Sequence, residues 1–231
     1  MKSFLFLIAI LLLGLVPPVS TAQQSSSPAD ASVSGGVYTN RYFGFSLSYP
    51  KDWVVHGEAT NERIKEIGKE RATSTGAMSA ASSAVVLRNT YQLLTTFQYP
   101  MGAAVEVNPG FLVVAERVSH APAIVTGRDY LNHVRPLMIK TGVAPVNEPV
   151  ELTLGGRKFF RQDFRMDVVG TSISQTIILT VTQGFALAFI LSGKDEASMA
   201  EMGKAVATLK FDSTLPKKPA DRSNPRPRPL P

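Results

Sequence analysis

Apolar and polar residues alternate along residues 42–49, which is the clearest pattern in the chain. Because successive side chains of a strand point to opposite faces, the alternation predicts a β-strand with one apolar face. Pro50 cannot continue a sheet ladder and should end this strand, and the chain's single tryptophan, Trp53, follows soon after. We therefore expect the first strand of a core here, with Trp53 buried beside it. The apolar face consists of Phe43, Phe45, Leu47 and Tyr49.

Two further strands are predicted at residues 91–99 and 111–118. The second is richer in apolar residues, which is typical of a central strand. In the first strand, one face should be apolar. It consists of Tyr91, Leu93, Phe97 and Tyr99.

The end of the chain predicts an antiparallel meander. Strand-like runs at residues 150–154, 157–169, 173–181 and 185–191 are separated by glycine-containing pairs, which are typical of tight hairpin turns. The last run is apolar at odd and even positions, so it should be buried on both faces. The turn pairs are Gly155–Gly156, Gly170–Thr171 and Gln183–Gly184.

A short surface helix is predicted at residues 60–71. Thr60 can cap its N-terminus, and Ile64 and Ile67 form a thin apolar stripe among charged residues. Residues 72–84 are almost all alanine, serine, threonine, glycine and methionine, without apolar periodicity. We expect a loop or mobile insertion there.

Two more helices follow. Thr126 with Asp129 three residues later forms a capping box that should begin one helix, and Pro136 should kink or stop it near Arg135. Ser192 is expected to cap the last helix, whose apolar stripe should pack on the sheet. That stripe consists of Met199, Met202, Val206 and Leu209.

The N-terminus has the organisation of a secretory signal. Lys2 precedes an apolar run over residues 4–16, which is shorter than the roughly 20 helical residues needed to span a bilayer. Small residues at positions 20–22 then favour cleavage after Ala22. The alternative is an uncleaved membrane anchor. We expect an exported protein of bacterial type, periplasmic or secreted.

The ordered domain is expected at residues 37–211. Residues 23–36 are rich in glutamine, serine, alanine and glycine, so they predict a flexible spacer. Residues 212–231 are rich in proline and basic residues, and they should form an extended, disordered tail. The pattern between these ends predicts one α+β domain, an antiparallel sheet flanked by helices.

Composition narrows the possible chemistry. The chain has 231 residues, of which 44% are hydrophobic, and its formal net charge is +6. This is enough apolar material for one good core. The absence of cysteine excludes disulfides, thiolate metal sites and a cysteine nucleophile.

No motif predicts a catalytic, metal or cofactor site. The histidines His56, His120 and His133 lie too far apart in sequence for a helical metal motif, although His56 could pair with Glu58. Asp163 and Asp167 could imitate the acid pair of a glycosidase. Arginines flank both, however, so a salt-bridged solvent face is the better interpretation.

Two basic features could contact a partner. The first is a cluster on one hairpin arm, which could meet an anionic headgroup, a polymer or an acidic protein; the alternative is a solvated sheet edge that prevents strand pairing. The second is the basic tail, which could dock on anionic envelope material or be only a solubilising segment. Nucleic acid is not expected as a partner. The cluster consists of Arg157, Lys158, Arg161 and Arg165.

The opening motif resembles the PsbP-like (Mog1/PsbP/DcrB) α/β/α sandwich superfamily over residues 37–211. A Gly-Gly-Arg before an aromatic strand and a closing Leu-Lys-Phe agree with it. The resemblance implies an antiparallel sheet with helices on both faces, an accessory or binding role, and no shared catalytic motif. The chain differs from photosynthetic members in its export signal and in residues 72–84. The motif residues are Tyr38, Asn40, Gly44, Phe45, Ser46, Leu47, Tyr49, Pro50 and Trp53.

The expected function is therefore that of an exported, non-enzymatic binding protein with a protein partner in the cell envelope. It would use a sheet edge or a groove between helix and sheet. The alternatives are a binder of a small molecule or an envelope polymer, or a hydrolase with an unrecognised site.

Overall fold

The computed structural model describes residues 27–168 and 170–212. The predicted signal over residues 1–22 lies outside the described residues, and so does the tail from residue 213 onward. Within the described ranges, no helix is both long enough and apolar enough to cross a bilayer.

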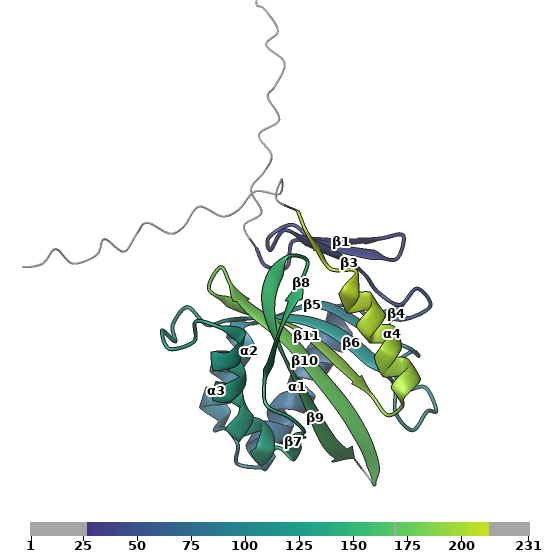
Figure 1. Cartoon of the computed structure of the whole chain (residues 1–231). Helices are drawn as coiled ribbons and strands as arrows, with labels where there is room; N and C mark the ends of the chain where they lie inside the picture. Colours follow the sequence, from purple (N-terminus) through teal and green to yellow (C-terminus); the bar gives the residue numbers. More distant parts are fainter. Residues whose placement is uncertain (1–26, 169, 213–231) are drawn as a thin grey trace, which may run out of the picture.

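A large antiparallel sheet forms the middle of the molecule (Figure 1). The predicted meander is confirmed, because β8, β9, β10 and β11 pair in sequence order. β6 is paired on both sides, with β5 and β11, so its predicted central position is also confirmed. Across the sheet the strands are β4 (Val54–Val55), β5 (Thr90–Phe97), β6 (Gly110–Arg117), β11 (Phe185–Gly193), β10 (Thr171–Thr182), β9 (Arg157–Val168) and β7 (Val143–Pro145), with β8 (Val150–Leu154) also paired to β9.

A smaller sheet carries the opening motif. The predicted first strand is β3, and its partner β12 comes from the far end of the described chain, where Lys210 pairs with Ser46. β1 pairs with β2, so the predicted spacer over residues 23–36 was too long. The reason is the Gly35–Gly36 turn, whose two positive φ angles of 56° and 78° fold the chain back on itself. The strands are β1 (Ala31–Ser34), β2 (Val37–Asn40), β3 (Phe45–Ser48) and β12 (Lys210–Phe211).

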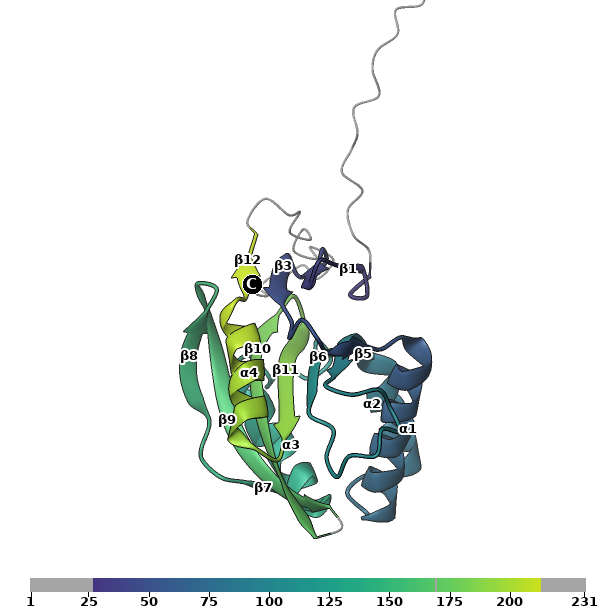
Figure 2. The same cartoon turned by 90° about the vertical axis from the view of Figure 1, so that its right-hand side faces the viewer.

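Helices cover both faces of the large sheet, which confirms the α+β architecture (Figure 2). α4 and the smaller sheet pack on one face. The other face is covered by α3, whose Leu131 is fully buried, and by the pair α1 and α2 beside β5. The helices are α1 (Glu58–Ser74), α2 (Ala80–Asn89), α3 (Gly127–Lys140) and α4 (Glu196–Ala207).

The main core lies between the large sheet, the smaller sheet and α4. Phe45 of β3 meets Phe189 of β11 there, with ring centroids 5.8 Å apart. Trp53 is only 6% exposed and belongs to this core, so its predicted burial is confirmed. β11 is buried on both faces, as predicted, because the main core covers one side and the cluster under α3 covers the other.

Two predictions around residues 58–84 were wrong. Thr60 is not a cap, because α1 begins at Glu58 after Gly57, which offers no side-chain cap. Residues 72–84 are not a loop, because α1 continues to Ser74 and α2 begins at Ala80, after Ser79 accepts a hydrogen bond from the Ser82 N–H. Alanine is the strongest helix former, and here its propensity acts without an apolar stripe.

Three smaller predictions also need correction. The predicted stop near Arg135 is wrong, because Pro136 lies inside α3, which continues to Lys140. Asp195, and not Ser192, caps α4 by accepting a hydrogen bond from the Ser198 N–H. In β5 a bulge between Gln92 and Leu94 shifts the alternation, so that Leu94 is buried. The Thr126–Asp129 capping box is confirmed.

Candidate functional site

The main concave surface on the α4 side is a groove between α4 and strands β8–β10, which we call the α4 groove. It consists of two adjoining pockets of about 330 Å³ and 210 Å³. The two pockets share Arg161, Thr176 and Met199 as lining residues. Most residues that line the larger pocket are polar or charged, so we call it the polar pocket, and most residues that line the smaller one are apolar.

The apolar pocket has walls from three parts of the fold. β8 supplies Leu152 and Leu154, and β10 supplies Ile178. Met199 and Val206 of α4 close the opposite side. The meander and the last helix come together here because both bury apolar residues against the main core.

Gly203 keeps the apolar pocket open. It lies inside α4, where glycine is less favourable than alanine by about 1 kcal/mol. Apart from its chain neighbours and the nearby backbone of α4, no described atom lies within 4 Å of the position that a Cβ would occupy, and its φ is not positive. Neither close packing nor backbone conformation therefore requires glycine at this position. Its structural consequence is the open space in the groove.

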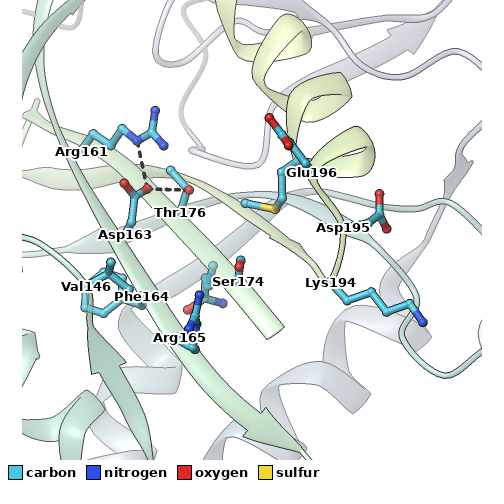
Figure 3. A pocket seen from close by; sticks show the side chains of 12 residues that line it. Val146, Arg161, Asp163, Phe164, Arg165, Ser174, Thr176, Lys194, Asp195 and Glu196 are labelled. Atoms are coloured by element: carbon cyan, nitrogen blue, oxygen red, sulfur yellow. Dashed lines mark hydrogen bonds and ion pairs between the residues drawn. The ribbon is translucent and has the colours of Figure 1, made fainter. Parts of the chain in front are cut away.

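An ion pair on β9 lines the polar pocket (Figure 3). Arg161 Nε donates to Asp163 Oδ1 at 2.9 Å, and Thr176 Oγ1 donates to the same oxygen at 2.7 Å. Partial burial alone would raise the pKa of Asp163, but the hydrogen bonds from Thr176, Arg161 and Asn147 lower it below its usual value. The carboxylate is thus held in its charged form.

Two further cations, Lys194 and Arg165, line the polar pocket, and only Lys194 forms an ion pair among the described residues. Lys194 Nζ lies 2.5 Å from Glu106 Oε2, so its charge is already paired. Arg165 is exposed on β9 and forms no ion pair with any residue of the described ranges. Figure 3 shows Arg165 near Ser174, across the groove from the α4 N-terminus. Of the three cations that line this pocket, Arg165 is therefore the one whose charge has no ion-pair partner among the described residues.

The four basic residues predicted as one cluster lie in different environments. Arg161 and Arg165 line the α4 groove. The Arg157 guanidinium lies 3.7 Å from the centroid of the Phe211 ring, and Lys158 forms an ion pair of 3.0 Å with Glu151. β9 pairs with β10 on one side and with β7 and β8 on the other, so these residues do not protect a free sheet edge.

A free sheet edge beside the groove belongs to β8, which pairs only with β9. In the part of the chain that the structure describes, no hydrogen bond reaches the outer backbone edge of residues 150–154. Val150 at its start is 56% exposed. Leu152 and Leu154 of the same strand line the groove. A free strand edge and an apolar groove therefore lie side by side.

The other polar residues singled out in the sequence do not come together. His56 Nδ1 is 3.3 Å from Thr60 Oγ1, it forms no ion pair with Glu58, and burial lowers its pKa. His120 and His133 are exposed at separate places, and Asp167 is exposed on β9. No group of metal-binding residues occurs among residues 27–168 and 170–212.

Sequence analysis expected a sheet edge or a groove between helix and sheet, but it did not locate the groove or identify its walls. It named Arg161, Arg165 and a salt-bridged Asp163, and the ion pair of Asp163 with Arg161 agrees with that interpretation. It did not single out Gly203 or the β8 wall. One available signal was a glycine that interrupts the apolar face of a capped helix. β8 forms a wall of the groove only because the β8–β9 hairpin packs beside α4, and no local sequence pattern predicts that packing.

No family model matches the sequence, and no curated protein matches it. The solved structures that it resembles include the cyanobacterial PsbP, CyanoP, from Synechocystis, with 11% identity and a TM-score of 0.48 over 85% of this chain and 100% of that one. LpqN of Mycobacterium tuberculosis, described as involved in cell envelope biogenesis, has 13% identity and a TM-score of 0.41 over 72% and 82%.

A protein from Bacteroides thetaiotaomicron is also similar, with 14% identity and a TM-score of 0.41. The match covers 84% of this chain and 52% of that one, so the chain spans about half the length of the Bacteroides protein. These neighbours include a PsbP protein, the family that the opening motif resembles. With TM-scores below 0.5, they carry no argument about function.

Proposed function

We propose that this protein is an exported, non-enzymatic accessory protein that binds an extended segment of a partner protein along the α4 groove. The observation that carries the proposal is an apolar groove, kept open by Gly203, directly beside the free edge of β8. The predicted signal with cleavage after Ala22 supports export.

An extended segment fits this surface for a geometric reason. A strand added to β8 would gain main-chain hydrogen bonds along the unpaired edge. Its alternate side chains would point to the same face as Leu152 and Leu154, which is the face that lines the groove. Backbone pairing would supply affinity, and the apolar pocket would select a side chain.

Charge adds a second requirement for the partner. Arg161 is already paired with Asp163, whereas Arg165 has no ion-pair partner in the described chain. A carboxylate of the bound segment would therefore meet Arg165 at the polar end of the groove. Arginine is well suited to this contact, because its fork of N–H groups binds a carboxylate bidentately.

The groove supports binding better than hydrolysis. A general base works best with a pKa near the operating pH. The pKa of Asp163 is instead lowered below its ordinary value of 3.8 by hydrogen bonds from Thr176 and Arg161, which makes its carboxylate a weak base. The histidines also lie outside the groove lining.

A capture experiment with groove variants tests this proposal. Residues 23–231 are used as bait in an extract of the cell envelope, beside Gly203→Leu, which fills the apolar pocket. Gly68→Leu is the matched control, because Gly68 is also a helical glycine with no described atom within 4 Å of its Cβ position. We expect the wild-type bait and the control to retain a protein that Gly203→Leu binds about tenfold less tightly.

A second bait that ends at residue 211 separates the folded domain from the basic tail. Capture by this shorter bait would support the groove. Equal capture by Gly203→Leu, or capture that requires residues 212–231, would overturn the proposal. If no bait retains a protein, the small-molecule alternative becomes the better explanation.

A further inference from the structure

A third pocket lies on the opposite side of the large sheet from the α4 groove, and the proposed function does not use it. It has a volume of about 240 Å³ and lies between α1, α2 and β5. We call it the α1–α2 pocket. Its apolar lining comes from Ile64, Ala72, Met78, Val86 and Leu87.

The helix above this pocket is poorly packed. α1 has 17 residues, all of them described, and none is buried. Ile67 in its thin apolar stripe is 45% exposed. An amphipathic helix of a globular protein normally buries its apolar stripe against the core. In α1 the apolar stripe is not buried, and an open pocket lies between this helix, α2 and β5.

Gly68 adds to the open space of this pocket. It lies inside α1 and lines the pocket, and no described atom lies within 4 Å of the position of its Cβ. Its φ is not positive, so the backbone does not require glycine. A larger residue here would place its side chain in open space at the pocket lining.

Ser83 supplies a second, independent observation. This α2 residue lines the pocket and is only 3% exposed. Its hydroxyl oxygen is buried and has no hydrogen-bond partner among the described residues. Buried hydroxyl groups in native proteins nearly always have a partner, and an unsatisfied one is unfavourable. A bound molecule with a hydrogen-bonding group would provide the missing partner.

The charges around the pocket are paired with one another. Lys65 Nζ lies 2.7 Å from Glu62 Oε1, and Lys69 Nζ lies 3.1 Å from Glu66 Oε2. Their alkyl chains line the pocket while their charges are neutralised one turn earlier on the same helix.

The pocket therefore offers apolar surface and three neutral polar side chains, without an unpaired charge in its lining. Thr90 and Gln92 already donate hydrogen bonds within the protein, whereas the Ser83 hydroxyl has no partner among the described residues.

We propose that the α1–α2 pocket binds a small, uncharged, largely apolar molecule that carries one hydrogen-bonding group, such as the hydroxyl of an aliphatic alcohol. The apolar body contacts Ile64, Met78 and Val86, and the polar group pairs with Ser83. The molecule supplies the apolar contact that α1 lacks.

Fluorescence of N-phenyl-1-naphthylamine tests the pocket in the intact mature chain. This probe is neutral, apolar and carries one N–H group, and its emission rises in apolar surroundings. We expect saturable binding to the wild type and at least about tenfold weaker binding to Gly68→Leu. Glu70→Leu is the matched control and should bind normally, because it adds a leucine at an exposed position of α1 outside the pocket lining. Weak probe binding by the wild type, or equal binding by Gly68→Leu, would overturn the proposal.

Competition then identifies the chemical class. Decan-1-ol should displace the probe at a concentration about tenfold lower than decanoate does. Equal displacement by decanoate would overturn the assignment of an uncharged ligand. Ser83→Ala should weaken displacement by decan-1-ol several-fold, and an unchanged value would overturn the role of the hydroxyl. Thermal unfolding of Gly68→Leu at or above the wild-type temperature shows that lost binding is not lost folding.

Discussion

α4 and α1 each carry a glycine above a pocket, but they are held to the sheet in different ways. α4 buries Met202 and Val206 in the main core, and Leu209 just beyond its end is also buried. α1 buries none of its residues. The α4 groove is therefore a rigid surface beside a well-anchored helix, whereas the α1–α2 pocket lies under a helix that can move with little loss of packing.

The difference shows that an open pocket can have two origins. Beside α4, the pocket remains because one position of a packed helix lacks a side chain. Under α1, the pocket remains because the whole helix contacts the sheet loosely. The first arrangement suits a partner that needs a preformed surface, and the second suits a small molecule that completes the packing.

The largest expected effect separates the two helices by stability. Met202→Ala should lower the free energy of unfolding by about 2–5 kcal/mol, because it leaves a cavity in the main core. Ile67→Ala in α1 should change it by about 0.5 kcal/mol or less, because that side chain is 45% exposed. Urea denaturation followed by the emission of buried Trp53 measures both. Equal losses would contradict the difference in anchoring.

The next effect concerns the two glycines. Gly203→Ala and Gly68→Ala should each raise the free energy of unfolding by about 1 kcal/mol, because both lie in helix interiors with open space around the Cβ position. A methyl group is too small to fill either pocket. Urea denaturation measures the gain, and Gly127→Ala is the contrasting control, because a Cβ there would lie 2.6 Å from the Leu179 carbonyl oxygen. A loss of stability at Gly203 or Gly68 would contradict the open space.

A smaller effect depends on pH at the polar end of the α4 groove. The pKa of Asp163 is lower in the folded protein than its ordinary value of 3.8, so its charged form stabilises the fold above that pH. This contribution is lost as pH falls through the lowered pKa. The difference in unfolding free energy between wild type and Asp163→Asn should therefore shrink from pH 6 to pH 3.

Urea denaturation at the two pH values measures that difference. Asp167→Asn is the matched control, because Asp167 is an exposed aspartate of the same strand whose side chain forms no hydrogen bond or ion pair among the described residues. A difference between wild type and Asp163→Asn that is constant with pH would contradict the stabilising role of the carboxylate.

Local patterns in the sequence predicted much of this fold. The alternation around Phe45 and Leu47, the hairpin turns of the meander and the Thr126–Asp129 capping box depend on neighbouring residues, and each was confirmed. The pairing of Lys210 with Ser46 joins distant parts of the chain, and no local pattern specifies it. Residues 72–84 were misjudged because alanine forms helices without an apolar stripe.

The candidate site was harder to predict than the fold. Arg161 and Arg165 were named from their charge, and both line the α4 groove. The interpretation of β9 as a possible sheet edge was wrong, because β7 and β8 fold back and pair with it. Pockets are spaces between distant segments, so only the glycines at positions 68 and 203 gave a sequence signal for them.

The smallest expected change in stability comes from Arg165, and it gives the sharpest test of the groove. Arg165→Ala should change the free energy of unfolding by about 0.5 kcal/mol or less, because the side chain is exposed and has no ion pair in the described chain. It should still weaken capture of the partner several-fold and reduce the salt dependence of that capture, since one charge contact is lost. Lys158→Ala, which removes an exposed lysine of the same strand that does not line the groove, is the control and should capture normally. Equal losses in both variants would mean that net positive charge, and not the α4 groove, attracts the partner.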